Sequence, residues 1–257
     1  MRNILSITVV GLLLGVAYGT DYCNLKTCGS SKHIGCNNNG AWGSACPSDK
    51  ALINLSAAEK NVILDKHNEY RNFIAGGGDS KLSPACRMAT MQWNDELAHL
   101  ASLNVKSCEM RHDACRNTDA FNWAGQNLAW IGYFNPLNTT ANAISSVNMW
   151  YSEVSNTQQA YINSYPANYN GPTIGHFTVM VADRNTHVGC AVSTYSVKGQ
   201  SYKAFLMACN YAATNVIGVK IYNSCSVPAS KCTTGVNPKY KFLCSTKEVY
   251  DVNNLNY

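Results

Sequence analysis

Four polar side chains lie in short stretches of the sequence that could together form a chemical site. His176 stands directly before Phe177–Val181, an alternating run that predicts a strand with one buried face. His67 lies in "HNEYR", on the apolar face of a predicted helix, while "MWYSEV" supplies Glu153 and "GQNLA" supplies Gln126. A histidine in such a setting can act as the base of a nucleophile, ligate a metal ion, or pack inside the fold.

The sequence contains none of the common hydrolase motifs. It has no Gly-x-Ser-x-Gly elbow, no His-Glu-x-x-His helix and no phosphate-binding glycine loop. A nucleophile must lie within hydrogen-bond reach of its base, and no serine is singled out as meeting that condition. A non-enzymatic protein is therefore the favoured hypothesis, and a hydrolase is the alternative.

Helices in the first part of the chain and strands in the second must position these side chains. Ser56-Ala-Ala-Glu59 is a capping box that opens a helix, and the glycines at 76–78 end it. The apolar spacing predicts further helices over 88–105 and 141–165. Three strands are predicted after Pro172, in "HFTVMVA", "HVGCAVSTYSV" and "SYKAFLMACNYA". This order indicates an α+β fold, with helices packed on an antiparallel sheet.

The ends and the composition indicate a secreted, extracellular protein. Residues 1–19 have the basic start, the apolar core and the small final residues of a signal peptide, and no second apolar run predicts a membrane span. All 12 cysteines follow that segment, so we expect six disulfides and no catalytic thiol. The formal net charge of +5 comes without a dense Lys/Arg run, which argues against a nucleic-acid partner.

The chain divides into four segments. After the signal peptide we expect a cysteine-rich N-terminal arm at 20–54, a domain at 55–219 and a disulfide-bearing C-terminal extension at 220–257. Asn54 and Asn138 stand in N-linked glycosylation motifs.

The four stretches resemble signatures of the CAP superfamily, which includes cysteine-rich secretory proteins, insect antigen 5 and plant pathogenesis-related proteins. "FLMACNYAATN" resembles another signature of the family, and the resemblance covers 55–219 in family order. "DYCNLKTCGSSKHIGC" resembles the arm of insect antigen 5, and "CRMATMQWNDELAHLA" is similar to the antigen-5-related proteins of flies.

This resemblance implies an α-β-α sandwich, with a small antiparallel sheet between helices and a central cleft. It implies that His67, Gln126, Glu153 and His176 face that cleft. It also implies four disulfides, namely Cys23–Cys36, Cys28–Cys115, Cys46–Cys108 and Cys190–Cys209. The four remaining cysteines allow three pairings, of which we favour Cys225–Cys232 with Cys86–Cys244.

Many family members carry Glu where this chain has Gln126, so the cleft loses one negative charge. No cofactor is expected to be required, but weak zinc binding by His67 and His176 is a hypothesis, with a hydrogen-bonded polar cluster as the equal alternative. We expect a monomer that binds an extracellular protein, such as a host factor, or a small apolar ligand. The alternative is a hydrolase or metal-dependent protease using a His67/His176 cleft.

Overall fold

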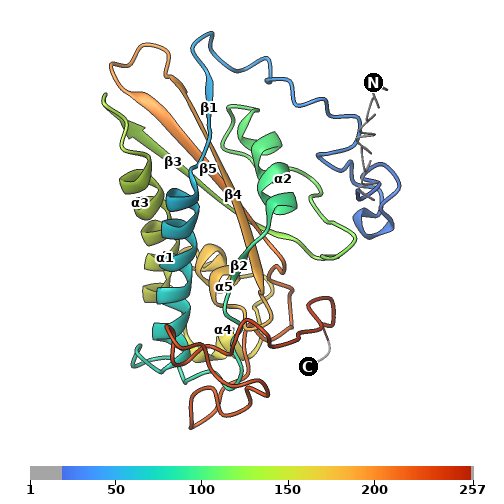
Figure 1. The fold of residues 1–257 in the computed structure, drawn as a ribbon, viewed down its shortest axis with the longest axis vertical. Coiled ribbons are helices and arrows are strands. Elements are labelled where there is room, and N and C mark those ends of the chain that lie inside the picture. Colours follow the sequence, from blue (N-terminus) through green and yellow to red (C-terminus); the bar gives the residue numbers. More distant parts are fainter. Residues whose placement is uncertain (1–18, 256–257) are drawn as a thin grey trace, which may run out of the picture.

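A five-stranded sheet lies between two layers of helices (Figure 1). The computed structural model describes residues 19–255, so the predicted signal peptide falls almost wholly outside the described residues. The strands are β1 (Ala51–Ile53), β2 (Gln92–Trp93), β3 (Gly125–Tyr133), β4 (His187–Ser196) and β5 (Lys203–Tyr211). They follow the order β1-β4-β5-β3, all antiparallel, with β2 pairing in parallel to one end of β4. The α+β sandwich is confirmed.

The helices cover the two faces of the sheet unequally. On one face α1 (Ala57–Ala75), α3 (Thr139–Ser152) and α5 (Gly175–Val181) share the larger apolar core with β4 and β5. On the other face α2 (Asp95–Val105) buries Ala101 and Val105 against the same strands. A short 3-10 turn (Glu153–Asn156) and α4 (Gln159–Asn163) connect α3 to α5. Within residues 19–255, no helix combines the length and the apolar character that a membrane crossing needs.

Side-chain caps fix the starts of the three long helices. The Ser56–Glu59 capping box is present, with both reciprocal hydrogen bonds, and Asn94 and Asn138 cap α2 and α3 through their side-chain oxygens. Asn138 uses its side-chain carbonyl oxygen for this cap. Its side-chain nitrogen, the atom to which an N-linked glycan is attached in glycoproteins, is not used by the cap. Asn54 and Asn138 are both exposed, and their glycosylation stays a prediction.

The predicted strand "HFTVMVA" is wrong, because Gly175–Val181 forms helix α5. All five residues of Phe177–Val181 are buried. The segment therefore has no exposed face here, and its sequence pattern carries no sign of the helical period. Thr178 fits this interior because its hydroxyl donates to the Ile174 carbonyl one turn earlier. A short apolar run of this kind is compatible with a strand or a buried helix.

Two predicted helices are shorter than the spacing suggested. The segment predicted to begin at Met88 becomes helical only at Asp95, after β2. The helix predicted over 141–165 ends at Ser152, where Glu153 turns toward α5. In both places tertiary contacts override a favourable local period.

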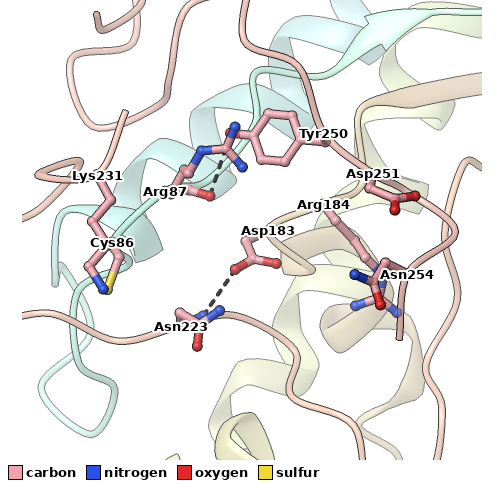
Figure 2. Close-up of a pocket in the computed structure, with 9 residues that line it drawn as sticks. All are labelled: Cys86, Arg87, Asp183, Arg184, Asn223, Lys231, Tyr250, Asp251 and Asn254. Atoms are coloured by element: carbon pink, nitrogen blue, oxygen red, sulfur yellow. Dashed lines mark hydrogen bonds between the residues drawn. The ribbon is translucent and has the colours of Figure 1, made fainter. Parts of the chain in front are cut away.

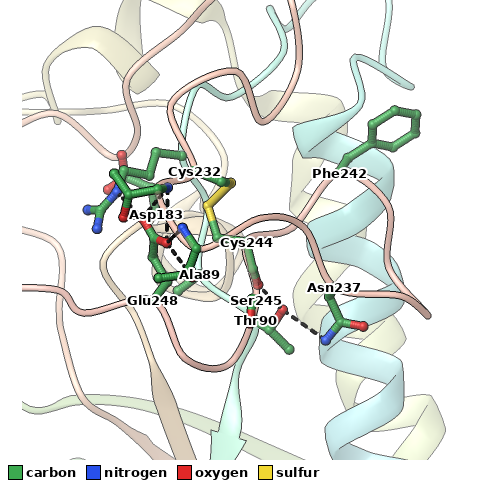
Figure 3. Close-up of a disulfide and its surroundings, with 12 residues drawn as sticks. Ala89, Thr90, Asp183, Cys232, Asn237, Phe242, Cys244, Ser245 and Glu248 are labelled. Atoms are coloured by element: carbon green, nitrogen blue, oxygen red, sulfur yellow. Dashed lines mark hydrogen bonds and ion pairs between the residues drawn. A yellow bond between two sulfur atoms is a disulfide. The ribbon is translucent and has the colours of Figure 1, made fainter.

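The structure contains six disulfides, and four of them are the pairs that the family resemblance implied. The other two are Cys86–Cys225 and Cys232–Cys244, so Cys225–Cys232 and Cys86–Cys244 are wrong. The extension runs back along Cys86, whose N–H donates to Asn223 and whose carbonyl accepts from Lys231. The N–H of Cys244 instead donates to the Met88 carbonyl, two residues after Cys86, and there Cys244 forms its disulfide with Cys232 (Figure 3). Short sequence spacing therefore does not select the partner.

The N-terminal arm lies against α2 and the loop that follows it. The hydroxyls of Thr20 and Tyr22 donate to Glu96 on α2, at 2.6 and 2.9 Å. His33 stacks on the Tyr22 ring with centroids 4.6 Å apart, and its Nε2 donates to the Asn117 carbonyl. The arm therefore has a small buried contact of its own, which its composition did not reveal.

Removal of Cys28–Cys115 by a double Cys→Ser substitution should loosen the arm while the sheet stays folded. The bridge closes a loop of 87 residues, which is worth about 4.6 kcal/mol in the chain-entropy model. We expect faster amide hydrogen exchange over residues 21–38 and unchanged exchange in β4 and β5. The matched control removes Cys232–Cys244, which should leave the arm unaffected; equal loss of protection in arm and sheet would contradict the prediction.

Candidate functional site

A polar cleft of about 270 Å³ opens between α5, one end of β3 and the loop after α2. Three of the predicted site residues are placed at it, since His176 and Gln126 line it and Glu153 binds His176 from behind. Its lining consists of His112, Gln126, Asn127, Thr173, Gly175, His176, Val179, Thr214 and Asn215. The second histidine of the cleft is thus His112, and not the predicted His67.

Glu153 fixes the orientation of His176. Its carboxylate accepts hydrogen bonds from the backbone N–H groups of His176 and Phe177, at 2.8 and 3.1 Å, and from Nδ1 of His176 at 2.6 Å. Burial alone would raise the pKa of Glu153, but the hydrogen bonds and charge from His176 and the Phe177 N–H outweigh burial and lower it. Because the ionised carboxylate accepts from Nδ1, the Nε2 atom of His176 is left for the cleft.

His112 approaches the cleft from the loop between two disulfide cysteines, Cys108 and Cys115. Its Nδ1 is 2.7 Å from Oε1 of Gln126. Sequence reasoning missed this residue because "SCEMRHDAC" has no apolar period and lies in no predicted helix or strand. The available signal was positional, since a histidine held between two disulfide cysteines has a well-fixed backbone.

His67 lies behind the cleft and has no atom to offer it. It is fully buried on α1, where Nδ1 donates to the Ile63 carbonyl at 2.7 Å and Nε2 is 2.8 Å from the Tyr211 hydroxyl. Burial lowers the pKa of His67 to about 4, so the ring is neutral at pH 7. Asn127 separates it from the cleft by donating to both the Tyr211 hydroxyl and the His176 carbonyl. In this structure His67 is therefore a hydrogen-bonded core histidine, with both ring nitrogens engaged within the chain.

A second group with metal-ligand chemistry lies in the arm. One ligand atom from each of Cys28, His33 and Cys115 falls within 4.8 Å of the others. However, Cys28 and Cys115 are bonded to one another, and both nitrogens of His33 are engaged by the chain. Metal binding requires the thiolate form of cysteine, so this group has no ligand to offer while the disulfide is intact.

Another cavity, of about 330 Å³, lies under the C-terminal extension (Figure 2). Arg87 lines it, stacks on the Tyr250 ring at 4.2 Å and pairs with Glu248 at 2.7 Å. Asp183, opposite, accepts from the Asn223 N–H. These contacts hold the extension on the domain, so we regard this cavity as structural and the cleft as the candidate site.

The cleft can bind through its imidazoles, but it has few groups for covalent catalysis. None of its nine described lining residues is a serine or a cysteine. Two threonines are present, and the side chain of Thr173 contributes to lowering the pKa of Glu153. The arrangement is one of two histidines, each held at Nδ1 by a second residue, which is the usual setting of metal-binding histidines in proteins.

Comparisons with known proteins agree on one family. The CAP profile, described as the cysteine-rich secretory protein family, matches residues 64–211. Venom allergen-1 of Aedes aegypti is 41% identical over 247 residues, covering 95% of this chain and 94% of the relative. Antigen 5 like allergen Cul n 1 of Culicoides nubeculosus is 38% identical over 201 residues, covering 75% of this chain and 91% of the relative.

Among solved structures, the crystal structure of NaASP2 with Zn²⁺ aligns with a TM-score of 0.63 at 23% identity. The alignment covers 78% of this chain and 100% of that chain. At this identity the likeness concerns the fold alone.

Proposed function

The chain belongs to the cysteine-rich secretory protein (CAP) family, and on that basis we propose that it is a secreted, antigen 5-like binding protein whose cleft holds a divalent metal ion. The observation that carries the metal proposal is the pair of histidines in the cleft, His112 and His176, each engaged at Nδ1. The crystal structure of NaASP2, which shares the fold, is one with Zn²⁺, and this supports zinc as the divalent ion that we propose.

Export is supported by the disulfides and by the relatives. Six bridges and no free cysteine among the described residues fit an oxidising compartment. The insect relatives are named venom allergen and antigen 5 like allergen. We propose that the mature chain is extracellular and monomeric.

The donor set of the cleft fits a metal ion. Two neutral imidazole nitrogens can ligate zinc, and water can fill the open positions. Glu153 and Gln126 would then be partners of the histidines rather than ligands, because each accepts from an Nδ1–H. With two protein ligands, we expect weak binding.

An extracellular protein is the partner that we favour over a small apolar ligand. The cleft is lined mainly by polar residues. Between α1 and α3, the Tyr70 and Tyr151 rings stack on one another with centroids 3.6 Å apart. The disulfide-fixed loops therefore provide the surface that we expect a protein to contact.

Zinc binding should depend on His112 and His176 and not on surface histidines. We expect His112→Ala and His176→Ala to weaken binding at least tenfold in calorimetric titration of metal-free protein. The matched control is His99→Ala, an exposed histidine of α2 away from the cleft lining. Absence of heat with the unaltered protein at millimolar zinc would exclude the metal site.

A hydrolase remains the alternative, because the Glu153–His176 pair could orient a base. Peptide and ester substrates should show no sustained turnover by the purified protein, with or without zinc. Turnover that persists through purification and disappears in His176→Ala would favour the alternative.

A further inference from the structure

We infer that Asp113 and Asn210 orient the amide of Gln126, and that this amide places the proton of His112 on Nδ1, leaving Nε2 as its ligand atom. The inference rests on the proposed metal-binding function and assigns two positioning residues to the cleft. It also assigns a reason for the amide at position 126, where the family resemblance implies a carboxylate.

The Leu97 carbonyl fixes the orientation of the Asn210 amide. A carbonyl oxygen can only accept, so the Asn210 nitrogen 3.1 Å away must be its donor amide. The Oδ1 of Asn210 then faces Gln126 and, as an acceptor, requires the Nε2 of Gln126 at 2.9 Å. Asn210 is fully buried, so the backbone carbonyl determines the orientation of its amide.

Asp113 imposes the same orientation on Gln126 independently. Its Oδ2 lies 2.7 Å from Nε2 of Gln126, and its other oxygen accepts from the Arg116 guanidinium at 2.7 Å. A carboxylate paired with arginine accepts hydrogen bonds and does not donate them. Two acceptors thus hold the NH₂ group of Gln126, and a flipped amide would lose both hydrogen bonds.

The orientation of Gln126 determines the tautomer of His112. Only Oε1 of Gln126 remains to meet Nδ1 of His112, at 2.7 Å, so Nδ1 must carry the proton. In the neutral ring the unprotonated atom is then Nε2, which also holds at His176, where the Glu153 carboxylate accepts from Nδ1. Two different partners, an amide and a carboxylate, prepare the two histidines in the same state.

Restoring a carboxylate at position 126 should therefore not improve the site. In Gln126→Glu, the second carboxylate oxygen would face the oxygens of Asp113 and Asn210, and no donor would remain between them. Like charges and opposed acceptors repel, so the side chain would leave its place beside His112. In this chain the amide is the residue that fits.

The test combines histidine tautomers with zinc affinity. Long-range ¹H–¹⁵N spectra of the metal-free protein should show His112 and His176 in the Nδ1–H form. In Asp113→Asn the Arg116 guanidinium should keep the one remaining oxygen, so the new NH₂ group would face the NH₂ of Gln126 and oppose the orientation that Asn210 favours. This substitution should add the Nε2–H form of His112 only, and zinc affinity should fall about tenfold. Gln126→Glu should also bind zinc about tenfold more weakly. The matched controls are Asp65→Asn and Gln158→Glu, which lie outside the cleft lining and should change neither readout.

The outcomes separate this inference from the proposed function. The inference is supported, even where zinc does not bind, if His112 is in the Nδ1–H form in the wild type and in a mixture of the Nδ1–H and Nε2–H forms in Asp113→Asn. Zinc binding with His112 in the Nε2–H form overturns it. Tighter zinc binding by Gln126→Glu also overturns it, because that result would mean that the restored negative charge at position 126 matters more than the orientation of the amide. The unchanged His176 tautomer serves as the internal check that Asp113→Asn is folded.

Discussion

Arg71→Met should lower the free energy of unfolding by about 3–5 kcal/mol, the largest loss that we expect from a single substitution. Arg71 is fully buried on α1, and its guanidinium donates to the carbonyls of Ala89, Met180 and Ala182 at 2.6–3.1 Å. Burial lowers its pKa to about 10, so it stays charged at pH 7. Methionine fills similar volume but removes all of these guanidinium donors, although the Ala182 carbonyl keeps the Asn185 N–H.

The same substitution should disturb the cleft. Met180 lies in the last turn of α5, the helix that carries His176, and the Ala182 carbonyl directly follows that helix. A cation beside these carbonyls also complements the negative end of the helix. Guanidinium unfolding at pH 7 measures the stability loss, and the chemical shifts of His176 report the cleft.

Lys60→Met is the control for removal of a positive charge. Lys60 pairs with Asp95 at the surface, where the Asp95 side chain is 85% exposed, so its loss should cost under about 1 kcal/mol. A similar cost for Arg71→Met and Lys60→Met would mean that the buried carbonyls find other donors.

Glu248→Gln should detach the end of the C-terminal extension at neutral pH. Glu248 lies close to the Cys232–Cys244 bridge (Figure 3). Its carboxylate is buried among donors: Nε of Arg87 at 2.7 Å and the N–H and hydroxyl groups of Thr233 and Thr234 at 2.6–3.1 Å. Burial alone would raise its pKa, but these donors outweigh burial and lower the pKa from 4.5 to about 2.

The lowered pKa gives this prediction a direction in pH. The folded state holds the carboxylate ionised, so its stabilisation is complete above pH 4.5 and disappears as the pH falls to about 2. The pKa difference corresponds to about 3 kcal/mol. The stability gap between wild type and Glu248→Gln should therefore be about 3 kcal/mol at pH 7 and small near pH 2.

Amide exchange over residues 245–255 locates the effect, and Glu69→Gln is the control. Glu69 forms an ion pair with Lys66 at the surface, so its substitution should leave that segment protected. A gap that does not change between pH 7 and pH 2 would mean that the charge of Glu248 does not matter.

The sequence predicted the elements that have a clear start or period. The capping box placed α1 within one residue, and alternation with a short connection placed the β4–β5 hairpin. The sequence did not predict α5, because a short helix buried on all sides shows no helical period. It also did not predict β1 and β2, whose three and two residues are too short to carry one, or β3, whose first five residues are all buried and show no alternation.

The candidate site was only partly predictable for a related reason. Glu153 and His176 meet as expected, because both lie in recognisable motifs. His67 was misassigned because its place on the apolar face of α1 indicates burial, and burial here means complete hydrogen bonding within the core. His112 lies in a loop, where residue type does not reveal which side chains meet in space.

The Cys86–Cys225 bridge constrains the order of events during biosynthesis. Its cysteines are 139 residues apart, and β3, α3, α5 and the β4–β5 hairpin all lie between them. A chain that enters an oxidising compartment from its N-terminus exposes Cys86 long before Cys225 arrives. By then Cys23–Cys36, Cys28–Cys115, Cys46–Cys108 and Cys190–Cys209 have all had both partners available. On the proposed export route, Cys86 must therefore stay reduced, or be released from a wrong partner by an isomerase, until the sheet has been synthesised.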